Sequence, residues 1–338
     1  MENSDFTAIS EKLANPSKVL LTTHSNPDGD AIGSCLAFFS YLKKKNHAVK
    51  MIIPDPFPEF LAWMSGHEEI LDFENQKNAC LEAIKSADLI FALDFNNLSR
   101  LNNVGKFILE SSSCKMLIDH HLFPSDEFLY KISTSLTSST SELVFDFIKD
   151  SGDIHLIDKE MAACLYAGII TDTGSLSYSC NYVKTYLTIA ELYKLGIDGE
   201  HIHRLIYDTF SENRLRLLGY SISDKLTVLP EFHTAYITLS KEDLQRFNYE
   251  IGDTEGVVNY ALSIKDINLA ALFMERDGIV KVSFRSKGNF SVEEFAREHF
   301  DGGGHHNASG ANCQTTLKQT IAKFKALLPV YQSQLKLV

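Results

Sequence analysis

The first half of the chain alternates short apolar runs with helical patterns, and this alternation most constrains the fold. The apolar runs are residues 19–23, 49–53, 89–94 and 116–119. The helical patterns are residues 31–45, 139–149, 159–170 and 182–195. Because the short runs are continuously apolar, they are typical of a parallel sheet covered on both faces. The pattern therefore predicts a doubly wound α/β domain with a mostly parallel sheet.

The pattern changes near residue 230. The runs 234–239, 269–274 and 280–285 alternate as half-exposed strands do, and 254–263 and 292–299 have helical patterns. A last amphipathic helix is predicted at 317–328. Such helices usually cover a core, so we expect it to pack on its own domain, with membrane docking as the alternative. The second half is predicted to be a smaller α+β domain.

These patterns divide the chain into three parts. Residues 1–185 form the first domain, 186–228 form a helical connection, and 229–338 form the second domain. With 338 residues, the chain is long enough for two packed cores.

The charge of the chain restricts its partners. It has 32 Lys and Arg against 44 Asp and Glu, for a net charge of −12. That balance argues against a wide basic surface for long nucleic acid, although a local pocket for a short anionic substrate stays open.

Compartment signals point to the cytoplasm. The six cysteines are scattered without a C-x-x-C pair, which is typical of reduced thiols. The N-terminus is acidic and polar, unlike a signal peptide, and no apolar stretch approaches the roughly 20 residues that span a bilayer. We therefore expect a cytoplasmic protein without a membrane partner.

Metal-type ligands cluster at the ends of the predicted strands of the first domain. They are His24, Asp28 and Asp30, then Asp94, then Asp119, His120 and His121, and finally Asp172 at the end of a helix. Parallel strands bring their carboxyl ends to one edge of a sheet. Carboxylates gathered there repel one another unless a cation is present. Two divalent ions would balance four aspartates, and oxygen with imidazole favours Mn²⁺ or Mg²⁺ over structural zinc.

Each of these residues also has an ordinary interpretation. Asp94 or Asp172 alone could cap a helix, Asp28-Gly29 is a common turn, and His120 could be a hydrogen-bonded core histidine. The metal site is favoured because four such segments occupy matching positions.

The motifs together resemble the DHH family of phosphoesterases. They are "HSNPDGDAIG" at 24–33, the strand-end Asp94, Asp119-His120-His121 and the later Asp172. Residues 302–310, "GGGHHNASG", are similar to the Gly-Gly-Gly-His signature of the DHH-associated C-terminal domain. The resemblance covers roughly residues 15–335. It is strongest to the short two-domain members that act on nanoRNA and on pAp (adenosine 3′,5′-bisphosphate).

The resemblance implies a site with two divalent metal ions, Mn²⁺ above all, with Mg²⁺ possible. The ligands it assigns are His24, Asp28 and Asp94 for one ion, and Asp30, Asp94, His120 and Asp172 for the other. Asp94 would bridge the ions. The catalytic residues it implies are His121, which would face the substrate phosphate, and Asp119, which would orient a histidine.

The second domain is expected to hold the far end of the substrate. The residues that the resemblance assigns to substrate binding are Arg285, Ser286, Gly302, Gly303, Gly304 and His305. Glycines allow close approach of backbone N–H groups to phosphate, and arginine suits bidentate phosphate binding. The alternatives are a helix stop for the glycines and a surface salt bridge for Arg285.

Two further features have both a structural and a phosphate-binding interpretation. Arg100 could reach a phosphate, but a helix or domain contact is the favoured interpretation. Ser139 to Glu142 is a capping-box pattern that opens a helix, although helix N-termini also attract phosphates.

The predicted function is a two-metal phosphoesterase. It would hydrolyse short RNA oligonucleotides to mononucleotides, or the nucleotide bisphosphate pAp to AMP and phosphate, or both. The alternatives are a cyclic or linear dinucleotide phosphodiesterase, a RecJ-like single-strand exonuclease, and a non-catalytic nucleotide-binding regulator. A homodimer is left open.

Overall fold

The computed structural model describes residues 4–276 and 278–336, and the chain divides between Thr209 and Phe210 into two compact units. The first unit precedes this division and the second unit follows it. The division falls inside the segment 186–228, which was predicted to be a helical connection. The three domain limits drawn from the sequence stay a prediction.

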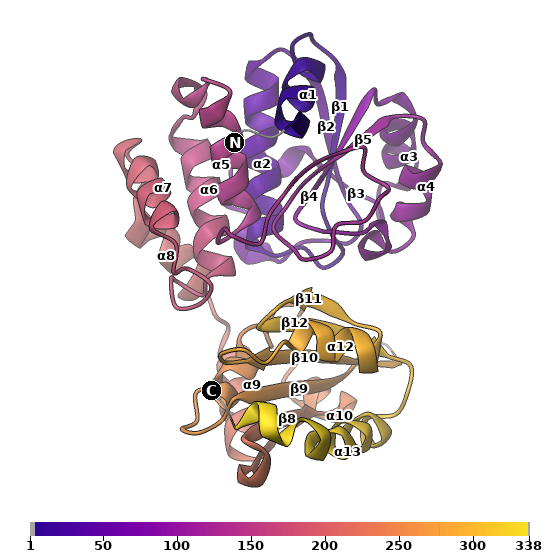
Figure 1. Ribbon diagram of the computed structural model, residues 1–338, viewed down its shortest axis with the longest axis vertical. Coiled ribbons are helices and arrows are strands. Elements are labelled where there is room, and N and C mark those ends of the chain that lie inside the picture. The colour runs from indigo at the N-terminus through magenta and orange to yellow at the C-terminus, as the bar shows by residue number, and fades with distance from the viewer. Residues whose placement is uncertain (1–3, 277, 337–338) are drawn as a thin grey trace. The chain divides into compact units, whose positions relative to one another are not determined.

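A six-stranded sheet forms the centre of the first unit (Figure 1). Its strands are β1 (Lys18–Thr22), β2 (Ala48–Ile53), β3 (Ile70–Asp72), β4 (Leu89–Leu93), β5 (Cys114–Asp119) and β6 (Tyr130–Ser133). They lie in the order β3-β2-β1-β4-β5-β6, and every strand pair in the described residues is parallel. The doubly wound α/β prediction is confirmed. The short outer strands β3 and β6 were not predicted.

Helices cover both faces of this sheet (Figure 1). On one face lie α2 (Gly29–Lys44), α5 (Thr140–Asp150) and α6 (Lys159–Asp172), and on the other α3 (Lys77–Ser86) and α4 (Val104–Glu110). The remaining helices of the unit are α1 (Ser4–Lys12), α7 (Val183–Lys194) and α8 (Gly199–Tyr207). The axes of α2 and α6 approach closely because Gly33 has no side chain: a Cβ there would lie 2.5 Å from the carbonyl oxygen of Cys164.

The second unit has its own six-stranded sheet, in the order β11-β12-β10-β9-β8-β7. The strands are β7 (Leu226–Leu229), β8 (Thr234–Leu239), β9 (Leu269–Arg276), β10 (Ile279–Ser286), β11 (Gly303–His305) and β12 (Ala308–Cys313). Its helices are α9 (Glu212–Ser223), α10 (Lys241–Arg246), α11 (Val257–Leu262), α12 (Val292–Phe300) and α13 (Leu317–Leu335). Only the pair β8–β9 is parallel among the described strands. The α+β prediction is confirmed.

Strand β9 departs from its prediction. A half-exposed strand was expected at 269–274, but all of these residues are buried. The reason is that both faces of the second sheet are covered: Phe273 packs into a core with α12 and α13, and Leu272 packs into a core with α9 and α11. Alternate residues of β9 therefore pack into two different cores, one on each face of the sheet.

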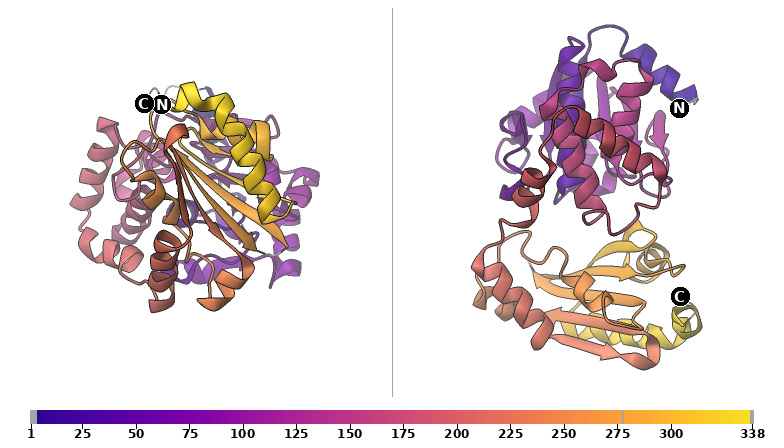
Figure 2. Two further views of the ribbon diagram at one scale, coloured as in Figure 1. Left: turned by 90° about the horizontal axis from the view of Figure 1, so that it is seen from below. Right: turned by 90° about the vertical axis from the view of Figure 1, so that its left-hand side faces the viewer.

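The last helix, α13, lies across the sheet of the second unit (Figure 2). Its Phe324 and Leu328 are fully buried, so the expected packing on its own domain is confirmed. The helix continues past Pro329 to Leu335, beyond the predicted end at residue 328. None of the helices in the described residues combines the length and apolarity needed to cross a membrane.

Candidate metal centre

The carboxyl ends of three neighbouring strands bring the candidate ligands together. Strand β1 pairs with β4, and β4 pairs with β5. His24, Asp94 and His120 each follow one of these strands within two residues. Asp28 stands at the start of α2, and Asp172 is the last residue of α6. The residues selected from the sequence therefore converge, although their role as ligands stays a proposal.

One group of candidate ligands consists of His24, Asp28 and Asp94, whose ligand atoms lie within 4.8 Å of one another. The Nε2 atom of His24 lies 3.6 Å from Oδ2 of Asp94. Its Nδ1 lies 2.9 Å from the carbonyl oxygen of Ser25. Since a carbonyl can only accept, Nδ1 carries the proton and the Nε2 lone pair faces the group, as a metal ligand requires.

A second group consists of Asp30, His120 and Asp172, within the same 4.8 Å limit. The Nε2 atom of His120 lies 3.5 Å from Oδ2 of Asp172 and 3.8 Å from Oδ2 of Asp30. It also lies 3.4 Å from Oδ1 of Asp94. The two oxygens of Asp94 therefore face two different histidines, one from each group, which is the arrangement expected of a bridging carboxylate.

The N-terminus of α5 holds two of the aspartates in place. The backbone N–H of Thr140 donates to Oδ2 of Asp30 at 2.7 Å, and that of Ser141 donates to Oδ1 at 2.9 Å. The Thr140 hydroxyl donates to Oδ1 of Asp94 at 3.0 Å. This helix start was interpreted as a cap, yet its N–H groups bind a carboxylate of the site, as the helix dipole favours.

The capping box predicted at this helix is half formed. The hydroxyl of Ser139 accepts the N–H of Glu142, as expected. The Glu142 carboxylate does not accept the backbone N–H of Ser139, as a full capping box requires. It accepts from the N–H and hydroxyl of Ser138 and from the hydroxyl of Thr185. The buried carboxylate thus fixes the loop that precedes α5.

The charges of the centre are strongly perturbed. Burial, with the charges of Asp94 and Asp172 added, raises the pKa of Asp30 well above its usual value. Burial disfavours a charged His120, but the carboxylates of Asp172 and Asp94 outweigh it and raise its pKa to about 10. The neighbouring carboxylates account for the His120 shift and for part of the Asp30 shift, and a cation at the same place would offset their negative charge. The donor set of carboxylate oxygens and imidazole nitrogens fits divalent cations such as Mn²⁺ or Mg²⁺.

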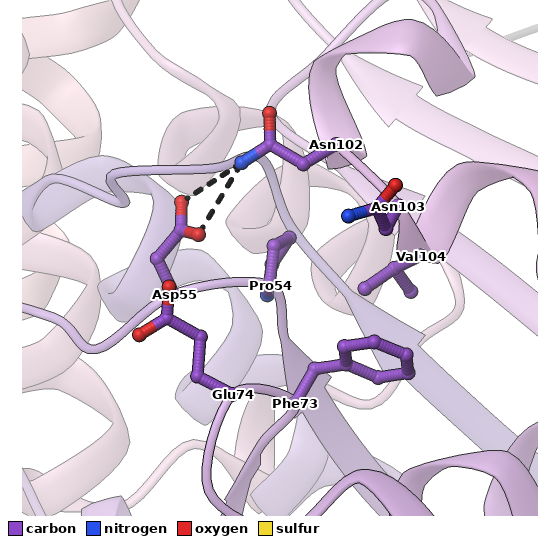
Figure 3. Close-up of a pocket in the computed structure, with 7 residues that line it drawn as sticks. All are labelled: Pro54, Asp55, Phe73, Glu74, Asn102, Asn103 and Val104. Carbon is purple, nitrogen blue, oxygen red and sulfur yellow. Dashed lines mark hydrogen bonds between the residues drawn. The ribbon is translucent and has the colours of Figure 1, made fainter. Parts of the chain in front are cut away.

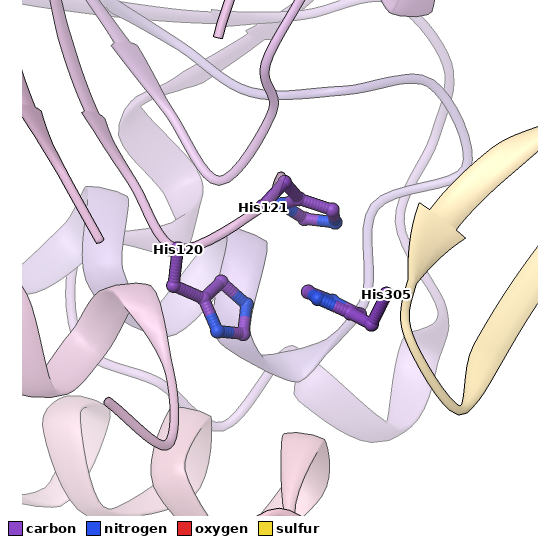
Figure 4. A group of neighbouring side chains, drawn as sticks. All are labelled: His120, His121 and His305. Carbon is purple, nitrogen blue, oxygen red and sulfur yellow. The ribbon is translucent and has the colours of Figure 1, made fainter. Parts of the chain in front are cut away.

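His121 takes part in a different network. Its Nδ1 lies 2.7 Å from Oδ1 of Asp119, and its Nε2 lies 2.9 Å from Nη1 of Arg100. Arginine only donates, so Nε2 accepts and Nδ1 donates to Asp119. The ring of His121 stands at 74° to that of His120, with centroids 5.0 Å apart (Figure 4). Burial, with the charge of Asp94 added, raises the pKa of Asp119 to about 7.

Arg100 is the residue of this centre that the sequence argument undervalued, since a helix or domain contact was favoured. It lies in a short 3₁₀ helix, η3 (Leu98–Leu101), that follows the strand-end Asp94. Besides its bond to His121, its carbonyl accepts the N–H of Ser25 at 2.8 Å, beside His24. A basic residue shortly after a strand-end aspartate was the available signal.

Two of the predicted substrate-binding residues share one face of the second sheet. Arg285 on β10 pairs directly with Ala308 on β12, and Ala308 pairs with His305 on β11. Directly paired residues point to the same side of a sheet, so Arg285 and His305 flank the small Ala308. Ser286 points to the opposite side: its hydroxyl donates to the carbonyl of Phe290 at 2.6 Å.

The three glycines before His305 differ in whether the surrounding structure would accept a side chain. A Cβ at Gly302 would collide with the carbonyl oxygen of Gly310, and one at Gly304 would lie 2.5 Å from that of Ala308. Gly304 also has a φ of 148°. Gly303 has open space on its Cβ side. Close packing against β12 therefore accounts for Gly302 and Gly304. Packing does not require a glycine at position 303, where a bound ligand could.

Two domain families match the chain. Residues 18–169 match the DHH family, N-terminal domain, and residues 232–333 match the DHHA1 domain. The chain belongs to the DHH family of phosphoesterases, and it is a hydrolase that acts on phosphoester bonds.

The chain is also similar to individual proteins over most of its length. A Streptococcus mutans protein named probable bifunctional oligoribonuclease and PAP phosphatase NrnA is 29% identical over 315 residues, 91% of this chain and 93% of that protein. The Bacillus subtilis bifunctional oligoribonuclease and PAP phosphatase NrnA is 28% identical, over 87% and 88% of the two chains. The crystal structure of an exopolyphosphatase-related protein from Bacteroides fragilis matches with a TM-score of 0.92 and 39% identity, over 98% of each chain.

Proposed function

We propose that this protein hydrolyses short oligoribonucleotides to mononucleotides, and pAp to AMP and phosphate, with two divalent cations, Mn²⁺ above all. The observation that carries this proposal is the position of Asp94 between the two ligand groups. The two relatives named oligoribonuclease and PAP phosphatase support the choice of substrates. The net charge of −12 favours short substrates over long strands.

The residues around Asp94 have separate tasks in this proposal. Two cations held by the ligand groups would supply positive charge to the phosphoryl oxygens and lower the pKa of a water molecule. The N–H groups of α5 keep the Asp30 carboxylate in one orientation, so little reorganisation is needed during reaction. In this proposal Arg100 turns from Nε2 of His121 to a phosphoryl oxygen. Asp119 keeps the proton of His121 on Nδ1, so that the released Nε2 accepts a proton from the attacking water.

The second unit supplies the remaining substrate contacts in this proposal. Arg285 forms charge-assisted hydrogen bonds to a phosphate, and His305 beside it contacts the same end of the substrate. Gly303 lets a phosphate approach the backbone closely, which is consistent with the open space next to it. Ser286 has the weakest case among the predicted residues, because its hydroxyl is already bonded to Phe290 and Asn307.

A substrate panel tests this function. Purified protein with Mn²⁺ is offered pAp, a diribonucleotide, a pentaribonucleotide, a 24-mer, a cyclic dinucleotide and inorganic polyphosphate. We expect the diribonucleotide, the pentamer and pAp to be hydrolysed fastest. EDTA should abolish the activity, and added Mn²⁺ should restore it. The products are separated by chromatography.

Other outcomes identify the competing functions. Preference for the 24-mer would indicate a RecJ-like exonuclease, and preference for the cyclic dinucleotide would indicate a cyclic-dinucleotide phosphodiesterase. Polyphosphate is included because the Bacteroides fragilis relative is named exopolyphosphatase-related. Activity that persists after complete removal of divalent metal would contradict the two-cation mechanism.

Arg100 gives a prediction of its own. Arg100→Ala removes the donor to Nε2 of His121 and a positive charge near the reacting phosphate. We expect kcat/KM on the diribonucleotide to fall by about 10²–10³-fold, the usual loss for one donor to a developing anionic charge. The matched control is Arg204→Ala on α8, whose exposed side chain pairs with Glu200 among the described residues. Unchanged kinetics in Arg100→Ala would assign Arg100 a structural role.

A further inference from the structure

A cavity of about 390 Å³ lies at the carboxyl ends of β2 and β3, beside the start of α4 (Figure 3). It is lined by Pro54, Asp55, Phe73, Glu74, Asn102, Asn103 and Val104. All of these residues belong to the first unit. The volume is in the range of small-molecule sites, about 300–1,000 Å³. No role has so far been assigned to this cavity.

One wall of the cavity is joined to the metal centre. Oδ2 of Asp55 accepts the backbone N–H of Asn26 at 2.9 Å. Asn26 lies in the loop between His24 and Asp28, which both belong to the first ligand group. Asp55 therefore links the cavity, which it lines, to the loop that carries the first ligand group. The carboxylate of Asp55 is held in place by the amide of Asn102, 3.3 Å from each oxygen (Figure 3).

The lining suits a ribose and a base better than a phosphate. Pro54, Phe73 and Val104 are buried and provide apolar surface. Two carboxylates, from Asp55 and Glu74, lie on one side and would repel a phosphate. No lysine or arginine is among the lining residues. Carboxylates accept hydrogen bonds well from hydroxyl groups, and a planar base can contact the apolar surface.

The polar groups of the cavity also favour a ribose. The side chains of Glu74 and Asn103 are exposed at the cavity, and neither forms a side-chain hydrogen bond to another residue in the described ranges 4–276 and 278–336. Asp55 follows the end of β2 at Ile53. In doubly wound sheets with this strand order, an acidic residue after the second strand commonly binds a ribose hydroxyl. The fold therefore places Asp55 where a ribose is recognised in other proteins of this topology, and Glu74 after β3 lines the same cavity.

We propose that this cavity binds the ribose and base of a nucleotide adjoining the scissile phosphate, with the Glu74 carboxylate, beside that of Asp55, accepting from the 2′-hydroxyl. The inference rests on the proposed function and specifies its substrate class: ribonucleotides are selected over deoxyribonucleotides. The 2′-hydroxyl is the group by which a protein distinguishes RNA from DNA at a given position.

The test compares three substrates in Mn²⁺: the diribonucleotide pApA, its deoxyribose counterpart, and bis(p-nitrophenyl) phosphate, which has neither ribose nor base. We expect kcat/KM for pApA to exceed that for the deoxy compound by at least about tenfold, the effect of one hydrogen bond to a charged group. Glu74→Gln should reduce this ratio several-fold. Asn103→Trp, which places an indole in the cavity, should raise KM for both dinucleotides. Neither variant should change the hydrolysis of bis(p-nitrophenyl) phosphate.

The control is Glu82→Gln, a matched loss of charge on the exposed side of α3, which should leave all three rates unchanged. Equal rates on the two dinucleotides, or a ratio unaffected by both cavity variants, would overturn the subsite and leave the proposed function intact. Hydrolysis of bis(p-nitrophenyl) phosphate without hydrolysis of either dinucleotide would overturn the proposed function, and the subsite with it. Circular dichroism confirms that each variant is folded.

Discussion

Asp94→Asn is expected to remove activity on the diribonucleotide almost completely. The loss should exceed the 10–100-fold typical of residues that only support metal ligands, because Asp94 belongs to the first ligand group and its Oδ1 lies 3.4 Å from His120 of the second. Asparagine is the appropriate replacement, since Asp94 has a φ of 66° and asparagine tolerates the left-handed region. Activity is measured as a function of Mn²⁺ concentration.

A second measurement separates loss of metal from loss of fold. Mn²⁺ should raise the unfolding temperature of the parent protein, because a ligand that binds only the folded state stabilises it. In Asp94→Asn this increase should be much smaller. Asp126→Asn is the control, since that side chain is fully exposed and pairs with Lys131 in the described part of the chain. A variant that keeps both full activity and the Mn²⁺ shift would refute a bridging role for Asp94.

Gly168→Ala should disturb the same centre by adding a methyl group next to Asp30, rather than by removing a ligand. Gly168 lies in α6, and a Cβ there would collide with Oγ of Ser141 and lie 2.7 Å from Oδ1 of Asp30. Overpacking of this kind costs about 1–3 kcal/mol, which corresponds to a fall of roughly 2–10 °C in unfolding temperature. Displacement of Asp30 should also lower kcat/KM by about 100-fold, as small misplacements of reacting groups do.

Gly219→Ala is the matched control for this substitution. It also replaces a glycine inside a helix, but a Cβ at Gly219 of α9 meets no atom within 4 Å. Alanine there should stabilise the protein by about 0.5–1 kcal/mol, because it has the higher helix propensity. Opposite changes in unfolding temperature for the two variants would support the packing argument. Two changes of the same sign would contradict it.

Much of the fold follows from local patterns. The four predicted strands of the first domain are found at β1, β2, β4 and β5, because continuous apolar runs bounded by polar residues carry a strong signal. The short outer strands β3 and β6 were missed, since a run of three or four residues has no usable periodicity. Strand β9 was predicted with the wrong exposure, because burial on its second face depends on helices elsewhere in the chain.

The candidate site was predictable where several possible ligands follow strands at matching positions, although each residue alone has other uses. Histidines and aspartates at the ends of parallel strands predict a candidate metal centre, because the topology brings them to one edge of the sheet. Arg100 was harder to place, because an arginine in a loop has many ordinary roles. The support from Thr140 and Ser141 could not be predicted at all. It comes from backbone N–H groups, which every residue except proline carries.

The hydrogen bonds between α5 and Asp30 join positions 110 and 111 residues apart in the chain. Asp172, the last of the candidate ligands, comes later still, at the end of α6. Contacts over such separations form late, because a long loop must close before they contribute free energy. During synthesis, a nascent chain that has not yet reached α6 therefore lacks a complete centre. If the proposed ligands hold the cations, the cation site is expected to be complete only after α6 has left the ribosome and folded.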